Sequence, residues 1–320
     1  MNSFTLGRRG FLAAAGATAI SACAASPRPA TGFKSTGGEP IGVQLYSVAA
    51  QANADLDGTL AALHTIGYRT VELAGYIGKT PQELRAALDK AGLKCTSTHV
   101  GGRVLRAGRS LNDDPAILAE EGHILGFDTV IMPLFNVPER LSFDKLPGED
   151  NAALIARLLG AMTEDDWKAN AAYLNEKGRG LKAHGLKIGY HNHNCEFGPL
   201  GGGTIMDLLL RETDPSIVSF ELDVGWVASA GVDPAAMIAA HPHRFTALHL
   251  KDIKASTKPN FNLKQDGTEV GSGIIDWRKL MPTARKAGIK RFFVEQEPPF
   301  EHPVLESLKT GFDFLAGLNA

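Results

Sequence analysis

The stretch TVELAGYIGKTPQELRAALDKAGLKCTSTHV, residues 70–100, contains one complete strand–helix–strand unit. Short apolar runs at its two ends predict strands. Between them Thr80 offers a hydroxyl cap, Pro81 a first-turn proline and Gly92 a glycine stop, which together predict the bounds of a helix. Strands joined through a helix pair in parallel, because the connection has to cross a face of the sheet.

The same alternation repeats along the rest of the chain. The predicted strands are 41–48, 70–74, 94–100, 129–133, 187–192, 217–223, 245–251 and 291–295. Eight such units in roughly 280 residues match a closed (β/α)₈ barrel. The alternative, an open doubly wound sheet, would normally carry a glycine-rich turn after its first strand, and 47–53 contains no glycine. We therefore predict a single-domain TIM barrel of the α/β class over residues 41–320.

The first forty residues have a different character. Arg8 and Arg9 precede Gly-Phe-Leu and a short run of small and apolar residues, which resembles a twin-arginine export signal over residues 1–26. The apolar run is shorter than the roughly 20 residues that span a bilayer. Residues 27–40 are rich in Pro, Ser and Gly and predict a flexible linker. We expect an exported, periplasmic protein.

The three cysteines bear on attachment and on cross-linking. Ile20-Ser21-Ala22-Cys23 resembles a lipobox, and we favour a lipid on Cys23 as the protein's attachment to a membrane. The alternative is cleavage near Ala25 without a lipid. Cys95 and Cys195 remain after processing, and we predict no structural disulfide between them.

The overall charge bears on the class of partner. The formal net charge is -2 and the basic residues are scattered, so no basic stripe is available for nucleic acid. The expected partner is a small molecule, and a homo-oligomer is compatible with the sequence. One long connection, 134–163, is of the kind that forms lids or partner surfaces.

Polar residues gather at the predicted carboxyl ends of the strands, where side chains of a barrel reach the active-site mouth. They are Gln44, Tyr46, Glu72, His99, His191, His193, Glu196, Asp223, His249 and Glu295. Burying several carboxylates together costs several kcal/mol per ion, so such a cluster implies a cation. Three carboxylates and one imidazole, in an oxygen-rich set, favour Mn²⁺, with Mg²⁺, Co²⁺ or Zn²⁺ as alternatives. The predicted ligands are Glu196, Asp223, His249 and Glu295.

Other residues receive different roles or a lower rank. We expect substrate binding by five residues: Gln44, Glu72, His99, His191 and Trp226. Glu221 and Glu297 each lie two residues from a stronger candidate and rank lower. Lys251 shares a strand face with His249 and is a catalytic candidate, although a strand-end salt bridge with Asp252 is the alternative.

Five ordered motifs carry a resemblance to a known family. They are GYHNH with EF at 189–197, ELDVGW at 221–226, LHLKD at 248–252, GSGIIDW at 271–277 and VEQ at 294–296. Together they resemble the xylose-isomerase-like sugar isomerase/epimerase superfamily, over nearly the whole chain after the signal. The resemblance implies a metal held by Glu, Asp, His and Glu from strands five to eight. Many relatives place Glu where this chain has His191, so either Glu196 or His191 is the strand-five ligand.

The resemblance and the cluster together predict a sugar enzyme. We expect a metal-dependent isomerase or epimerase acting through an enediolate on a ketose or oxidised sugar. Glu295 or Glu196 would remove the proton, and the partner carboxylate or His193 would return one. A lyase or dehydratase of 3-keto-glycosides is the alternative on the same fold. A non-catalytic sugar-binding lipoprotein is the alternative of another class.

Overall fold

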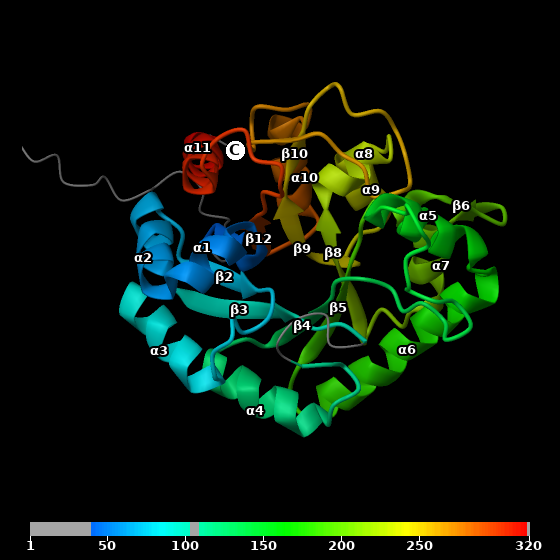
Figure 1. Ribbon diagram of the computed structural model, residues 1–320, viewed down its shortest axis with the longest axis horizontal. Helices are drawn as coiled ribbons and strands as arrows, with labels where there is room; N and C mark the ends of the chain where they lie inside the picture. Colours follow the sequence, from blue (N-terminus) through cyan, green and yellow to red (C-terminus); the bar gives the residue numbers. More distant parts are fainter. Residues whose placement is uncertain (1–39, 103–108, 319–320) are drawn as a thin grey trace, which may run out of the picture.

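The computed structural model describes residues 40–102 and 109–318. The expected export signal, the linker and Cys23 lie outside these residues. Eight parallel strands close into a barrel in the order β1-β12-β9-β8-β5-β4-β3-β2 (Figure 1). The strands are β1 Gly42–Gln44, β2 Thr70–Leu73, β3 Lys94–His99, β4 Thr129–Met132, β5 Lys187–His191, β8 Val218–Asp223, β9 Phe245–Leu250 and β12 Arg291–Val294. The predicted (β/α)₈ barrel is confirmed.

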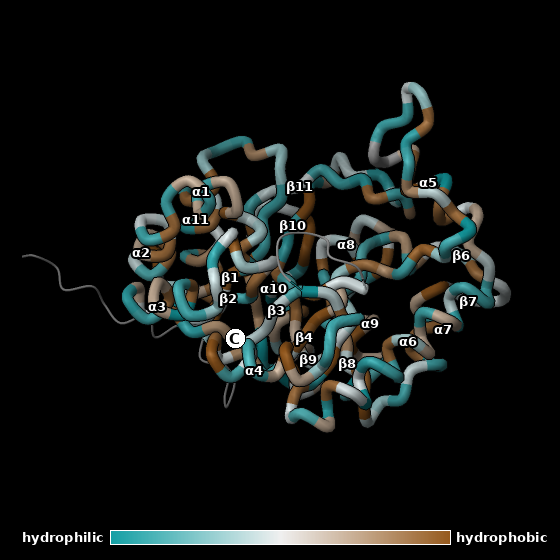
Figure 2. The backbone as a smooth tube through the Cα atoms, turned by 60° about the horizontal axis from the view of Figure 1, so that its bottom comes forward, coloured by the Kyte–Doolittle hydropathy of each residue, from teal (hydrophilic) through white to brown (hydrophobic). Residues whose placement is uncertain are grey.

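Helices surround the barrel, whose strands are largely apolar (Figures 1 and 2). They are α1 Ala49–Ala54, α2 Leu56–Ile66, α3 Pro81–Ala91, α4 Pro115–Leu125, α5 Asn151–Ala161, α6 Glu164–Ala183, α7 Ile205–Glu212, α8 Val224–Ser229, α9 Pro234–Ala240, α10 Trp277–Lys286 and α11 Val304–Gly317. Two small hairpins complete the described part: β6 Pro199–Leu200 with β7 Gly203–Thr204, and β10 Asp252–Ile253 with β11 Gly267–Thr268. No helix in this part of the chain is long and apolar enough to cross a membrane.

Helix α3 begins and ends where its sequence predicts. Thr80 and Glu83 form a reciprocal capping box, Pro81 occupies the first turn, and Gly92 follows in the left-handed conformation with φ 72°. These local signals place strand β3 at the correct distance from β2. The strand–helix–strand interpretation of residues 70–100 is therefore confirmed.

The first strand is shorter than predicted. We expected a strand over 41–48, but β1 ends at Gln44 and a 3₁₀ helix, η1 Leu45–Val48, follows. The Gln44 side chain accepts a hydrogen bond from the Tyr46 backbone N–H at 3.1 Å and so caps this turn. The early end turns Tyr46 toward the mouth of the barrel, where it lines a cavity.

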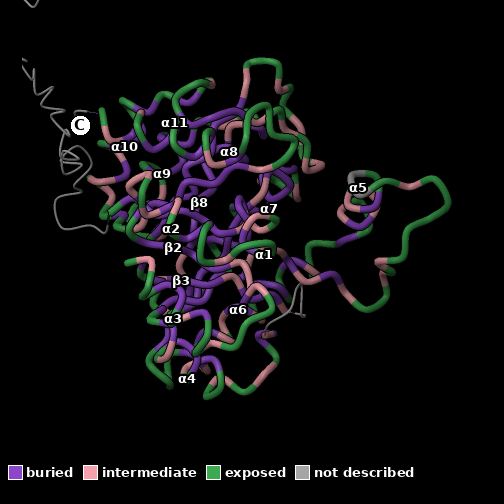
Figure 3. The backbone as a smooth tube through the Cα atoms, turned by 60° about the vertical axis from the view of Figure 1, so that its left-hand side comes forward, coloured by how far each residue is buried: buried purple, intermediate pink, exposed green. Residues whose placement is uncertain are grey.

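The long connection after β4 contains its own helix. Residues 134–150 and helix α5 project from the body of the barrel (Figure 3). Arg140 ties the base of this projection to Asp166 of α6, and Arg157 of α5 binds Glu149 at 2.8 Å. Leu134, at the start of the projection, reaches back to the active-site cavity.

Candidate active site at the carboxyl end of the barrel

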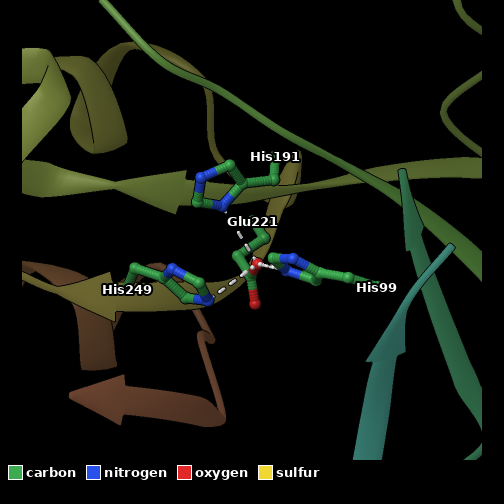
Figure 4. Close-up of side chains that lie close together, drawn as sticks. All are labelled: His99, His191, Glu221 and His249. Atoms are coloured by element: carbon green, nitrogen blue, oxygen red, sulfur yellow. Dashed lines mark hydrogen bonds and ion pairs between the residues drawn. The ribbon is translucent and has the colours of Figure 1, made fainter. Parts of the chain in front are cut away.

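Two overlapping groups of side chains lie together at the strand ends. The acid-rich group contains His191, Asp223, His249 and Glu295, and all four are buried. The histidine-rich group contains His99, His191, Glu221 and His249 (Figure 4). In each group, one ligand atom per residue lies within 4.8 Å of the others. The two groups share His191 and His249.

The acid-rich group is built from the ends of β5, β8, β9 and β12. His249 Nδ1 lies 3.1 Å from Glu295 Oε2 and 3.9 Å from Asp223 Oδ2. His191 Nε2 lies 4.0 Å from the same Asp223 oxygen. Two carboxylates and two imidazoles that converge in this way, all buried, form a donor set that fits a divalent metal.

The Lys251 side chain places a positive charge beside the acid-rich group. Its Nζ lies 2.8 Å from Asp223 Oδ2, 2.7 Å from Glu295 Oε2 and 3.2 Å from Glu297 Oε1. The Nζ also lies 5.1 Å from the centre of the Trp226 ring, a cation–π distance. The side chain therefore points into the site, and no described contact joins Lys251 to Asp252. The Asp252 carboxylate instead accepts hydrogen bonds from a neighbouring loop.

The histidine-rich group lies one layer deeper in the barrel. Glu221 precedes Asp223 by two residues, so both side chains share the inner face of β8. Glu221 Oε2 lies 3.2 Å from His99 Nε2, 3.2 Å from His191 Nδ1 and 3.1 Å from His249 Nε2. One carboxylate oxygen thus faces three imidazole rings.

Glu72 supports the same layer from β2. Its Oε1 lies 2.8 Å from His249 Nε2 and 2.9 Å from His99 Nε2, and it accepts a hydrogen bond from Gln44 Nε2 at 2.8 Å. Ser97 donates to the other oxygen at 2.5 Å. Gln44 and Glu72 are fully buried. They contact the histidines of the layer and do not line the cavity, although the sequence suggested substrate binding for both.

Burial and charge shift the pKa values of the site in opposite directions. Burial lowers the pKa of His249, but Glu221 and Glu295 together raise it well above its usual range. Burial and the nearby Glu295 charge raise the pKa of Asp223 to about 6, although Lys251 opposes the shift. Burial raises the pKa of Glu295, but Lys251 and His249 outweigh it and hold the pKa well below its usual range. Glu295 is therefore more completely ionised than Asp223 at neutral pH.

His99 should make the metal-free protein less stable at alkaline pH. Burial lowers its pKa, but Glu72 and Glu221 outweigh that effect and raise it from 6.5 to about 9. A raised pKa means that the folded state holds the proton more tightly, so the stabilisation is complete below pH 6.5 and is lost as the pH rises through about 9. The loss is on the order of 3 kcal/mol at most. Urea denaturation of chelator-treated protein should show this fall, and His99→Gln should remove much of it. A free energy of unfolding that is constant over this range would contradict the assignment.

Glu196 lies outside both groups. It belongs to the 3₁₀ helix η2 Cys195–Phe197, five residues after β5 ends. Its oxygens accept hydrogen bonds from the Tyr190 hydroxyl at 2.6 Å and from the His193 backbone N–H at 2.8 Å. His191 lies at the strand-five position of the acid-rich group instead. The two cysteines, Cys95 and Cys195, are buried free thiols.

A cavity of about 280 Å³ opens above the site. Its polar wall includes four residues that the sequence singled out: His99, His191, His193 and Glu295. Its apolar wall comes largely from connections between strands and helices: Tyr46, Tyr76, Val100, Pro133, Leu134 and Leu263. Of these six, the sequence had indicated only Tyr46, because loop residues carry no strand-end signal. Trp226 is buried beside Lys251 and His193 and is not part of the wall.

Asp252 anchors a loop beside the site. Its carboxylate accepts hydrogen bonds from the backbone N–H groups of Ile253, Gly271, Gly273 and Ile275, and from the Trp277 indole at 2.8 Å. The carboxylate is fully buried. The GSGIIDW motif therefore folds around a single side chain at the start of β10.

Replacing Asp252 by alanine should lower the free energy of unfolding by about 3–5 kcal/mol, because it leaves buried donors without an acceptor. Urea denaturation would measure the loss. Asp276 provides a matched control, because it caps helix α10 through the Lys279 backbone N–H at 3.1 Å. Its replacement by alanine should cost about 1 kcal/mol. Equal losses in the two variants would contradict the anchoring role of Asp252.

The fold and the site together define a class: a closed (β/α)₈ barrel whose mouth carries a buried cluster of carboxylates and imidazoles. The family follows from sequence comparison. Residues 60–318 match the family described as xylose isomerase-like TIM barrel, and the chain belongs to that family.

The relatives are sugar-modifying enzymes. The chain is 28% identical over 164 residues to an inosose dehydratase of Geobacillus thermodenitrificans. The aligned residues cover 46% of this chain and 53% of the relative. The match thus spans about half of the relative's length. A solved sugar phosphate isomerase/epimerase from Parabacteroides distasonis is 26% identical with a TM-score of 0.69, over 88% of this chain and 99% of that one.

Two more distant structures share the fold. One is a 3-keto-D-glucoside 4-epimerase from E. coli, 16% identical, with a TM-score of 0.58 over 86% of this chain and 98% of that one. The other is the IOLI protein with a bound zinc atom, 14% identical, with a TM-score of 0.60 over 86% of this chain and 96% of that one.

Proposed function

We propose that this protein is a divalent-metal-dependent sugar isomerase or epimerase that acts through an enediolate on a ketose or oxidised sugar. The observation that carries the proposal is the acid-rich group, His191, Asp223, His249 and Glu295, of which His191 and Glu295 line the cavity. These four residues would hold the metal. When bound, the metal would polarise the sugar carbonyl and stabilise the negative charge of the enediolate.

The ligand set differs from the sequence-based expectation at one position. We propose His191 in place of Glu196, because the Glu196 carboxylate is engaged by Tyr190 and His193. The change gives the site two nitrogen ligands instead of one. Mn²⁺ fits such a mixed set, and Zn²⁺ and Co²⁺ fit it as well. The zinc atom of the IOLI protein supports a metal of this kind on the same fold.

Proton transfer falls to groups that line the cavity. Glu295 is held as an anion at neutral pH, which suits a base that removes the proton next to the carbonyl. Burial lowers the pKa of His193, so its ring stays neutral, and its Nδ1 has no hydrogen-bond partner among the described residues. A neutral ring can accept the proton of a sugar hydroxyl and then return it, so His193 is placed to relay a proton. The Lys251 ammonium lies beside Glu295 and would stabilise a developing oxyanion.

A second function, cleavage of a 3-keto-glycoside by elimination, is supported by the apolar wall of the cavity. Tyr46, Tyr76, Leu134 and Leu263 would accommodate an aglycone better than a second polar sugar. Elimination needs the same proton removal, followed by loss of the group on the neighbouring carbon. The dehydratase relatives are named for a reaction of that general kind.

The cellular setting is proposed from the N-terminal sequence alone. Arg8, Arg9 and Cys23 support export to the periplasm, with a lipid on Cys23 as the membrane attachment. A neutral or oxidised sugar would be the partner there, and nucleic acid would not.

Hydrogen exchange would test the proposal directly. Metal-loaded protein would be incubated in D₂O with free ketoses and with 3-keto-glycosides, and the products followed by NMR. Deuterium next to the carbonyl, with the carbon skeleton intact, is the expected result for an isomerase or epimerase. Release of the aglycone would instead establish the lyase. Tight metal binding without exchange or cleavage would favour the sugar-binding protein.

A further inference from the structure

The two histidines shared by the groups present opposite ring nitrogens to each group. His191 faces Glu221 with Nδ1 at 3.2 Å and Asp223 with Nε2 at 4.0 Å. His249 faces Glu221 with Nε2 at 3.1 Å and Glu295 with Nδ1 at 3.1 Å. Figure 4 shows both rings, with that of His99, turned toward the single Glu221 carboxylate. The deeper carboxylate thus meets one nitrogen of each shared ring.

This contact decides which nitrogen carries the hydrogen. An ionised carboxylate only accepts hydrogen bonds, and a neutral imidazole has one N–H and one lone pair. Glu221 Oε2 has three ring nitrogens within 3.2 Å, one each from His99, His191 and His249, and the only group through which an imidazole can donate a hydrogen bond to it is an N–H. A histidine that binds a metal through one ring nitrogen keeps its hydrogen on the other, so in the metal-loaded protein the two nitrogens that face Glu221 carry the hydrogens. His191 is then protonated on Nδ1 and His249 on Nε2.

We propose that Glu221 is a positioning residue that sets opposite tautomers of His191 and His249. The remaining lone pairs, on His191 Nε2 and His249 Nδ1, then point at Asp223 and Glu295. The proposal rests on the proposed metal function, because those lone pairs are useful only to a cation in the acid-rich group. It gives a physical reason why two histidines can serve one site from opposite sides of their rings.

The same argument assigns the ion to one group only. A neutral ring has a single lone pair, so His191 and His249 cannot serve the acid-rich and the histidine-rich groups at once. Glu72 cannot replace Glu221 in this role. Its Oε1 lies 2.8 Å from His249 Nε2, but no described contact joins it to His191. Glu72 therefore offers a matched control that perturbs one ring of the pair.

The full-length protein loaded with Zn²⁺, a diamagnetic ion, would test the proposal. Long-range ¹H–¹⁵N correlation spectra distinguish N–H, free and metal-bound imidazole nitrogens. We expect His191 with Nδ1–H and His249 with Nε2–H. Glu221→Gln should weaken Zn²⁺ binding by about 10–100-fold in competition titrations, and it should alter the His191 pattern, because an amide can donate as well as accept. Glu72→Gln should leave the His191 pattern unchanged.

Two results would overturn the proposal. Zn²⁺-loaded wild-type protein with the reverse tautomers, His191 Nε2–H and His249 Nδ1–H, would place the ion in the histidine-rich group. Unchanged Zn²⁺ affinity and unchanged spectra in Glu221→Gln would show that Glu221 does not set the tautomers of the two histidines. The wild-type spectrum alone decides the first point, even if the variant does not fold. Correct tautomers without any hydrogen exchange on sugars would leave this inference intact and refute only the proposed function.

Discussion

Replacing Glu295 by glutamine should lower turnover by about 10³-fold, within the range that a positioned base contributes. The amide has the same shape but cannot take up a proton, and it is a weaker metal ligand. Glu295 lines the cavity, lies 3.1 Å from His249 Nδ1 and is kept ionised by Lys251 and His249 despite its burial. Steady-state rates at saturating metal would measure the loss, and sugar binding should survive.

Glu297 is the control for this prediction. It lines the same cavity and contacts the same Lys251 Nζ, at 3.2 Å, but it belongs to neither group of candidate ligands. Glu297→Gln should therefore change turnover by less than about tenfold, since it would lose only an interaction with a charge that is already paired. Comparable losses in the two variants would argue that the charge of the cavity, and not proton removal by Glu295, controls the rate.

The sequence could predict those site residues that the barrel itself positions. Asp223 and His249 lie in the last two residues of their strands and Glu295 directly follows its strand, and the carboxyl ends of parallel strands meet at one edge. Their convergence therefore follows from eight correctly placed strands. Glu221 carried a usable signal as well, because it lies two residues before Asp223 on the same strand face. Its rank was too low because sequence spacing does not reveal how many rings one carboxylate contacts.

The strand-five position could not be decided from the sequence. Every residue of β5 after Lys187 is buried, so the alternation that separates inner from outer side chains is absent. Glu196 lies beyond the strand in a short 3₁₀ helix, and its direction depends on the Tyr190 hydroxyl, which takes one of its oxygens. A contact of this kind forms only after the turn has folded. The apolar cavity wall from Tyr76 and Leu263 could not be predicted either, because it too forms only when the connecting loops have folded.

Removal of the Lys251 ammonium should destabilise the metal-free protein by about 3–5 kcal/mol, the usual cost of leaving a buried charge without its partner. Lys251 is nearly fully buried and lies within 3.2 Å of three carboxylates, those of Asp223, Glu295 and Glu297. Lys251→Met keeps the length of the side chain and removes its charge. Urea denaturation in the presence of a chelator would measure the loss.

Saturating Mn²⁺ should recover most of the stability lost in Lys251→Met, because a divalent ion in the acid-rich group would compensate the same carboxylates. Lys254→Met is the control: this residue pairs with Glu301 and Asp266 at the surface, where ion pairs contribute little. A Lys251→Met protein that is as stable as the wild type in chelator would show that the carboxylates are already neutralised by protons. In that case Lys251 would contribute to catalysis and not to folding stability. Lys251→Met should then lower the turnover rate without changing the free energy of unfolding.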